Sequence, residues 1–432
     1  MQPVAPAASL LRPSACPGLW RVVPARDGGI CRVKLPGGLL TSAQARAVAE
    51  AARLYGSGVL ELTNRSNLQL RGVREECQAP LVQHLLAGGL GPRNPAADDV
   101  RNLLLSPAAG RDRSAHLDTR PLAARLLALL ENTPEFHGLS AKFAIQLDGG
   151  ESLAMLDHPH DLWLSALPDG TRLAFGLAGC PRDPALGAIP LVQAEMLVET
   201  VLRLFLQAAG THTRMRQLLA ELSVEQFLAR LSLPVQQPWA TPLRPRYDSP
   251  PLGAHVQAQS GWVMLLAGAP LGRLHAEQLH ALAALADSEG SGELRLTPWQ
   301  GVLLPDVPVA RQAIVAQALN DIGLLLDDRA PLARMLACSG SAGCAKAGAD
   351  TKADAQRLAE RLGPNGPAQV HLSGCPRSCA AAHVAPYTLL AQPGGRYDLY
   401  RREQGLAGFG RLLAQSLDID QAGERLAAGS PE

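Results

Sequence analysis

The 432-residue sequence shows no bias toward charge of either sign. It carries 40 Lys and Arg against 39 Asp and Glu, a formal net charge of +1 at pH 7. Such a balance gives no overall attraction to nucleic acid or to an anionic membrane surface. No stretch approaches the roughly eighteen uninterrupted apolar residues that a membrane-spanning helix requires. We therefore expect neither nucleic acid nor a membrane as a partner, and any anion site must come from a local arrangement of Arg and Lys.

Signals for a bound nucleotide cofactor, for export and for a disulfide framework are also missing. No convincing G-x-G-x-x-G follows an expected strand, and there is no flavin signature, so reducing equivalents must come from an external donor such as a ferredoxin or an NAD(P)H-linked reductase. The N-terminus lacks the basic region and the long apolar region of a signal peptide. Four scattered cysteines fit free thiols in a reducing compartment: Cys16, Cys31, Cys77 and Cys180. We expect a cytoplasmic protein.

The other four of the eight cysteines form two close pairs near the C-terminus. Cys338 and Cys344 follow a C-x5-C pattern, and Cys375 and Cys379 follow a C-x3-C pattern. Four thiolates in two pairs can hold either a zinc ion or an iron–sulfur cluster. Their neighbours are mostly Gly, Ala and Ser, which would let the backbone approach a cluster and donate N–H groups to its sulfides. We predict a [4Fe–4S] cluster, with zinc or plain buried thiols as the alternatives.

An internal repeat relates residues 28–70 to residues 262–304 at a constant offset of 234. Its clearest anchor is GSGVLELT in the first copy against GSGELRLT in the second. Each copy predicts a strand, a helix with apolar residues at 3–4 spacing, and a second strand. Because a strand–helix–strand unit cannot bury its open face alone, we expect the two copies to pack as a pseudo-two-fold pair. Since one chain supplies both copies, a monomer is our hypothesis for the oligomeric state.

The remaining segments predict two further regions of mixed α and β structure. Between the copies, four strands and a helix are expected over residues 103–106, 143–148, 162–165, 172–177 and 191–208. A proline-rich linker is expected over 232–251. After the second copy, helices are expected over 309–322, 352–362 and 405–415, and strands over 370–372, 387–391 and 397–400. A mobile tail is expected after residue 418.

Together these features resemble the sirohaem sulfite/nitrite reductase superfamily over roughly residues 15–400. The resemblance is carried by RVKLPGG at 32–38, TNRSNLQ at 63–69, DVRN at 99–102 and KFA at 142–144, the last of which has one lysine where those reductases have two. It implies an α+β fold in four parts. These are a ferredoxin-like half-domain over 15–90, an inserted α/β domain over 91–245, a second ferredoxin-like half-domain over 250–325 and an iron–sulfur α/β domain over 326–420.

Within the superfamily, several segments are more similar to the precorrin-3B synthase branch. They are LDGG at 147–150, LTPWQG at 296–301, ADTKADA at 349–355 and HLSGC at 371–375, whereas PRS at 376–378 is more reductase-like. The missing second lysine favours the same branch, because reduction of sulfite or nitrite needs a dense cationic pocket. This resemblance implies oxygen-dependent hydroxylation of precorrin-3A at C20, with γ-lactone formation, in cobalamin biosynthesis. It also implies a [4Fe–4S] cluster and a mononuclear non-haem iron.

Three alternatives stay open. The first is a true sulfite or nitrite reductase, which would bind sirohaem and need the full cationic pocket. The second is a non-catalytic iron–sulfur subunit that carries electrons and binds no tetrapyrrole. The third is a zinc-stabilised binding module.

Six cations come from segments that this superfamily gathers round its macrocycle, where Arg and Lys suit the carboxylates of a tetrapyrrole. They are Arg32, Lys34, Arg65, Arg71, Arg101 and Lys142. For each of them a solvated surface charge is the alternative, and for Arg71 the two are equally weighted. No catalytic residue is assigned. The segment DHPHD at 157–161 has the residue types of a two-histidine, one-carboxylate iron site, but its proline favours an ordinary surface loop. His137, His212, His371 and His383 are no stronger as ligands.

Overall fold

The computed structural model describes residues 16–231, 244, 247, 249–364 and 366–428. Most of the linker expected over 232–251 therefore lies outside the described residues. No helix in the described part of the chain is long and apolar enough to cross a membrane.

The two copies of the repeat form equivalent half-domains. The first contains β1 (Val23–Ala25), β2 (Gly28–Val33), β3 (Leu39–Thr41), α1 (Ser42–Tyr55), β4 (Val59–Leu62), β5 (Leu68–Val73) and α2 (Gln78–Ala87). The second contains β11 (Gly253–Val256), β12 (Trp262–Gly268), β13 (Arg273–His275), α7 (Ala276–Glu289), β14 (Glu293–Leu296), β15 (Gly301–Pro308) and α8 (Gln312–Asp321). The offset of 234 continues to α2 and α8, so the repeat is longer than the sequence comparison indicated.

The half-domains exchange their short third strands. The sheet orders are β1-β2-β5-β4-β13 and β11-β12-β15-β14-β3. Leu274 of β13 pairs with Leu60 of β4, and Leu40 of β3 pairs with Leu294 of β14. Each five-stranded sheet is thus completed by the other copy. The predicted pseudo-two-fold pair is present, and this strand exchange holds it together.

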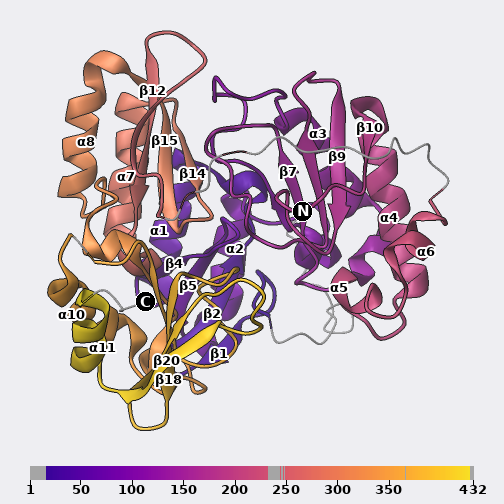
Figure 1. Ribbon diagram of the computed structural model, residues 1–432. Helices are drawn as coiled ribbons and strands as arrows, with labels where there is room; N and C mark the ends of the chain where they lie inside the picture. Colours follow the sequence, from indigo (N-terminus) through magenta and orange to yellow (C-terminus); the bar gives the residue numbers. More distant parts are fainter. Residues whose placement is uncertain (1–15, 232–243, 245–246, 248, 365, 429–432) are drawn as a thin grey trace.

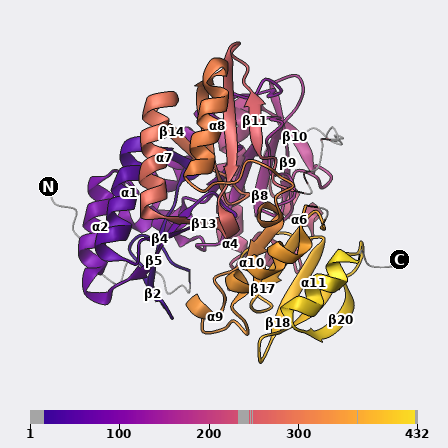
Figure 2. The same cartoon turned by 90° about the vertical axis from the view of Figure 1, so that its left-hand side faces the viewer.

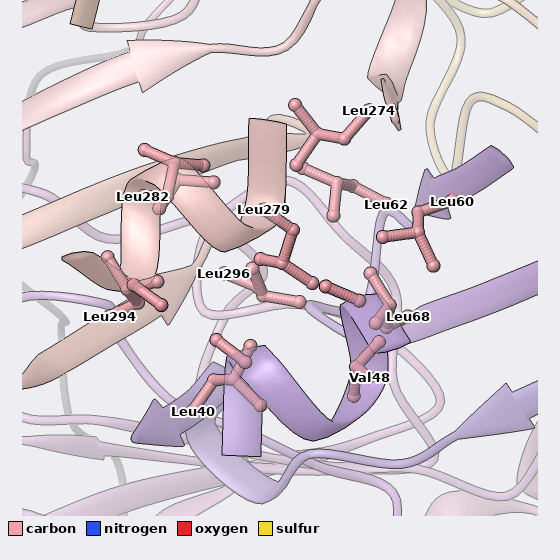
Figure 3. Packing of buried hydrophobic residues seen from close by; sticks show 14 of the residues in the cluster. Leu40, Val48, Leu60, Leu62, Leu68, Leu274, Leu279, Leu282, Leu294 and Leu296 are labelled. Carbon is pink, nitrogen blue, oxygen red and sulfur yellow. The ribbon is translucent and has the colours of Figure 1, made fainter. Parts of the chain in front are cut away.

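A single hydrophobic core joins the half-domains. Helix α1 packs against α7, and buried residues from both copies form one cluster. Figure 3 shows Leu40, Leu60 and Leu68 of the first copy close to Leu279 and Leu296 of the second. In Figure 1 these half-domains lie beside each other, with the region after α2 (magenta) on one side and the C-terminal domain (orange to yellow) below them.

Two further domains share a topology: one lies between the two half-domains in sequence, and the other is the C-terminal domain. The first contains β6 (Leu103–Leu104), α3 (Arg120–Asn132), β7 (Ile145–Asp148), β8 (Leu162–Ala166), β9 (Arg172–Leu177), β10 (Gly187–Pro190), α4 (Ala194–Ala208), α5 (Met215–Leu218) and α6 (Val224–Leu228). The second contains β16 (Met335–Ala337), α9 (Gly340–Gly343), α10 (Thr351–Leu362), β17 (Val370–Ser373), β18 (Tyr387–Gln392), β19 (Arg396–Arg401), β20 (Arg411–Leu417) and α11 (Ile419–Ala427).

Their strands also pair in the same way. The orders are β6-β7-β8-β9-β10 and β16-β17-β18-β19-β20. In both sheets the first three strands run parallel to one another, and each of the last two runs antiparallel to the strand before it. The two domains form separate cores, and Figure 2 shows β16–β20 as a distinct sheet with α10 and α11 packed on it. The chain is therefore two copies of a two-domain unit rather than a repeat with one insertion.

The C-terminal end differs from the sequence prediction. The helix predicted over 405–415 is wrong, because Arg411–Leu417 forms β20 at the sheet edge and three preceding glycines adopt positive φ: Gly405, Gly408 and Gly410. The predicted mobile tail is also wrong. Helix α11 begins after Asp418, whose Oδ1 accepts a hydrogen bond from the Gln421 N–H at 2.8 Å, and it buries an apolar face. The D-x-x-Q spacing was a readable N-cap signal.

The shared core yields a stability prediction. Replacing Leu279, which is fully buried in α7, by alanine should lower the free energy of unfolding by about 2–5 kcal/mol, because the side chain leaves a cavity between the two copies. The matched control is Leu54→Ala in α1, where the side chain is 39% exposed and a smaller loss is expected. Urea unfolding followed by circular dichroism would compare them. Equal losses in the two variants would contradict a core shared between the copies.

Candidate functional site

The cysteine loops begin at one edge of the C-terminal sheet. Strands β16 and β17 are parallel neighbours, so their carboxyl ends meet there, and they lead directly to Cys338 and to the Gly374–Cys375 turn. The Gly374 N–H donates to the Cys338 sulfur at 3.2 Å. A Cβ atom at position 374 would lie 2.6 Å from the Ala347 Cβ and 3.2 Å from that sulfur. The loop therefore requires glycine here, where backbone and thiol come close together.

The four thiols share one electrostatic neighbourhood. The pKa of Cys379 is raised by desolvation and then by the negative charges of Cys338, Cys375 and Cys344. Two residues of these loops, Gly340 and Ser378, have positive φ angles of 64° and 52°, which turn the chain tightly beside the thiols. This set of soft donors, surrounded by small residues and backbone N–H groups, fits an iron–sulfur cluster. Among the described residues, no group of three or more His, Cys, Asp and Glu side chains is arranged to hold a single metal ion.

Three of the six predicted substrate-binding cations have acidic partners inside the protein. Arg71 is 2% exposed and donates to both carboxylate oxygens of Asp27 at 2.6 and 2.9 Å, and to the Gly343 carbonyl at 3.1 Å. The charge of its guanidinium is already paired with Asp27, so Arg71 is not available to bind a ligand. Its contact with Gly343, the residue before Cys344, gives it a role in holding a cysteine loop instead.

Lys34 and Arg101 are the other two predicted cations with acidic partners. The Lys34 ammonium is 1% exposed, donates to the Asp98 carbonyl at 2.7 Å and lies 3.4 Å from the Asp99 carboxylate. Burial lowers the pKa of Lys34. Arg101 Nε lies 2.9 Å from the Glu131 carboxylate, and both side chains are buried. Lys34 is therefore paired within the fold, whereas Arg101 has the Glu131 carboxylate beside it but its Nε and Nη1 have no hydrogen-bond partner among the described residues.

Arg32, Arg65 and Lys142 stay available. Arg32 is partly buried, its Nε has no hydrogen-bond partner among the described residues, and its electrostatic neighbours include Cys379. The Arg65 guanidinium donates to the Lys142 carbonyl at 3.1 Å. Burial and then the positive charge of Arg214 lower the pKa of Arg65 to about 10. Lys142 is exposed. The structure thus brings these three predicted cations to the side of the molecule where Cys379 lies.

A fourth cation, Arg214, could not be found from any sequence motif. It lies between α4 and α5, outside every motif, and its Nε lies 3.0 Å from both carboxylate oxygens of Asp161. Asp161 also accepts the backbone N–H groups of Met215 at 2.8 Å and Ala144 at 3.0 Å. This buried carboxylate therefore orients Arg214 close to Arg65, leaving more positive than negative charge around the pair.

Histidines from two domains meet beside these cations. The rings of His158 and His383 lie 5.1 Å apart between centroids. Burial is the main cause that lowers the pKa of His158, that of His160 to about 3 and that of His371 to about 4. His158, His160 and His371 are therefore neutral at pH 7.

The candidate iron ligands that the sequence offered, none of them favoured, do not form a common site among the described residues. Asp157 forms an ion pair with Arg182 at 3.1 Å, and Asp161 binds Arg214, so both carboxylates of the segment 157–161 have protein partners. His137 is hydrogen-bonded to the Glu131 carbonyl at 3.1 Å and His212 lies 2.9 Å from Glu221. Nothing in the described geometry supports a mononuclear iron at these residues.

Comparison with known proteins gives the same family for both kinds of domain. A family model described as the nitrite/sulfite reductase ferredoxin-like half domain matches residues 23–88 and 255–322. A second, described as the nitrite and sulphite reductase 4Fe-4S domain, matches residues 96–239. The four cysteines lie in the topological counterpart of that second match.

Similar proteins include nitrite reductases and a precorrin-3B synthase. The ferredoxin–nitrite reductase of Synechococcus elongatus is 33% identical over 86% of this chain and 77% of its own length. That of Arabidopsis thaliana is 31% identical, covering 82% and 66%. The precorrin-3B synthase of a Sinorhizobium species is 27% identical, covering 96% and 92%. The solved structure of Mycobacterium tuberculosis NirA has the same fold, with a TM-score of 0.77 at 22% identity, over 92% of this chain and 79% of NirA. The α+β fold predicted from sequence is confirmed, and the chain belongs to the nitrite and sulfite reductase family.

Proposed function

We propose that the protein is a precorrin-3B synthase, which hydroxylates precorrin-3A at C20 with O2 and closes a γ-lactone in cobalamin biosynthesis. The observation that carries this proposal is the neutralisation of inner cations. Lys34 donates to the Asp98 carbonyl and lies 3.4 Å from the Asp99 carboxylate, and Arg101 forms an ion pair with Glu131. Since a sulfite or nitrite reductase needs a dense positive pocket round its small anion, paired cations at these positions favour a different substrate.

The cations that stay open suit a large guest with several carboxylates. Arg32, Arg65 and Lys142 come from three separate segments of the chain, so they can contact side chains on different parts of a macrocycle. Partly buried guanidinium groups that lack a full set of carboxylate partners are stabilised by an anionic ligand, and Arg forms bidentate bonds to carboxylates. In this proposal Asp161 orients Arg214 before the substrate arrives.

Length also supports the proposal. The similarity to the Sinorhizobium precorrin-3B synthase extends over nearly all of both chains, whereas this chain spans 77% and 66% of the two nitrite reductases above. The remaining 23% and 34% of those two reductases lie outside the alignments. Identity is nevertheless higher to the nitrite reductases, so a sirohaem-dependent nitrite or sulfite reductase is the second candidate.

We assign the cluster to Cys338, Cys344, Cys375 and Cys379. A [4Fe–4S] cluster supplies single electrons when bound. The chain's own contribution is to hold the thiolates with small residues around them and to donate the Gly374 N–H to the Cys338 sulfur. A ferredoxin or an NAD(P)H-linked reductase would deliver the electrons in the cytoplasm. No ligands are assigned to the mononuclear iron that the resemblance implies.

Cofactor content distinguishes the two candidates. Protein purified without oxygen should contain four or five irons and about four acid-labile sulfides, and no extractable sirohaem, because the four cysteines hold one cubane. Iron, sulfide and pigment would be assayed on one sample together with its absorption spectrum. Intense sirohaem absorption bands would favour the reductase candidate over the synthase, and zinc without sulfide would overturn both candidates.

The cysteine assignment makes a separate prediction. Cys375→Ser should abolish sulfide and most iron, because it removes one of four thiolate ligands. Cys77→Ser is the matched control, since Cys77 is also partly exposed but lies in the first half-domain before α2. It should retain full iron and sulfide content. A Cys375→Ser protein with the normal sulfide content would contradict the assignment.

The cation assignment predicts weaker substrate binding. Arg65→Gln should raise the Kd for precorrin-3A about ten- to a hundredfold, because it removes a hydrogen bond between charged groups. Anaerobic absorbance titration would measure binding. Arg329→Gln, at a side chain that is 81% exposed, is the control and should leave the Kd unchanged. Equal Kd values for the two variants would remove Arg65 from the substrate site.

A further inference from the structure

A buried carboxylate lies beneath the first cysteine loop. Glu61 of β4 is 9% exposed and accepts hydrogen bonds from Arg273 at 2.9 Å and from the Ser339 hydroxyl at 3.1 Å. Arg71 and Lys352 lie 3.6 and 3.8 Å from it. We call Glu61, Arg71, Arg273 and Lys352 the Glu61 network. These four side chains belong to both half-domains and to the C-terminal domain.

The Glu61 network contacts the residues on both sides of Cys338 and the residue before Cys344. Ser339 follows Cys338, and the Lys352 ammonium lies 3.3 Å from the carbonyl of Ala337, which precedes it. Arg71 binds the carbonyl of Gly343, immediately before Cys344. The same Lys352 donates to the Leu271 carbonyl at 2.6 Å, in the second half-domain. The positions of two thiols are thus fixed by ionic groups that they do not touch.

The charges of this network do not cancel. Arg71, Arg273 and Lys352 carry three positive charges, and Glu61 together with Asp27, the other partner of Arg71, carries two negative ones. A cluster on four thiolates is anionic, and reduction adds one more negative charge. Nearby positive charge therefore favours the reduced form, and a nearby carboxylate disfavours it.

The repeat offers an internal comparison. At the offset of 234, Glu61 corresponds to Arg295, which is 4% exposed and forms an ion pair with Glu293. The strand registers place Ser106 at the position of Cys338, since each lies three residues beyond the first paired residue of its strand, Leu103 or Met335. The carboxylate is therefore present in the copy whose neighbouring loop carries a cysteine and is replaced by a cation in the copy whose loop carries serine.

We propose that Glu61 is a positioning residue that sets the reduction potential of the cluster, holding it lower than the three surrounding cations alone would. This inference rests on the cluster assignment in the proposed function, but not on the substrate. It predicts opposite shifts for opposite charge changes in the same network.

The test is an anaerobic redox titration of the full-length, cluster-containing protein, followed by electron paramagnetic resonance. Glu61→Gln keeps the size of the side chain and one of its two acceptor oxygens while removing its charge. At the midpoint potential of the unaltered protein, its reduced-to-oxidised ratio should rise about tenfold, which is about 59 mV for a one-electron couple. Arg273→Gln, at a side chain that is 34% exposed, should lower that ratio. Glu293→Gln, in the other half-domain beside Arg295, is the control and should leave it unchanged.

Opposite shifts of the reduced-to-oxidised ratio in Glu61→Gln and Arg273→Gln support the proposal. An unchanged ratio, or shifts in the same direction, with sulfide content intact would overturn it. If Glu61→Gln loses the cluster, Arg273→Gln alone decides, since a lowered ratio supports the proposal and an unchanged one overturns it. Absence of sulfide from the unaltered protein would overturn the cluster assignment itself, so failure of the proposed function is seen before any variant is compared.

Discussion

The pairing of β3 with β14 and of β13 with β4 is the constraint on which the rest of this structure depends. Because each half-domain completes the sheet of the other, the two copies are held in one register and share one core. That register places Glu61 opposite Arg273. It thereby brings the first half-domain, the second half-domain and the Cys338 loop together at one point, so the geometry around the thiols follows from strand pairing far from them in sequence.

Much of the fold could be predicted because its signals are periodic and local. The offset of 234, the 3–4 spacing of apolar residues in α1 and α7, and the two cysteine pairs are all visible in the sequence. The duplication of the β6–β10 and β16–β20 domains is not visible, since it survives only in the order and direction of strands. The Leu- and Ala-containing segment 411–417 was misread because pairing at a sheet edge outweighed its local helix preference.

The site was harder to predict than the fold, because charge alone does not reveal a partner. Six cations stood in suggestive motifs, yet Arg71, Lys34 and Arg101 are paired with acids up to 65 residues away in sequence. Arg214 was overlooked for the opposite reason, since only the folded position of Asp161 gives it a direction. Arg65 and its counterpart at the same offset, Trp299, illustrate how one scaffold position can serve charge in one copy and packing in the other.

Strand exchange has a consequence for how such a chain can change over time. Neither copy can form a five-stranded sheet without the other, so both must be retained for folding, whatever each does chemically. Only one copy needs to keep thiols in its loops, and the other can carry Ser106 at the place of Cys338. Its part in strand pairing thus protects the first copy, which lacks these thiols, from loss, while the loop position that corresponds to Cys338 is free to diverge.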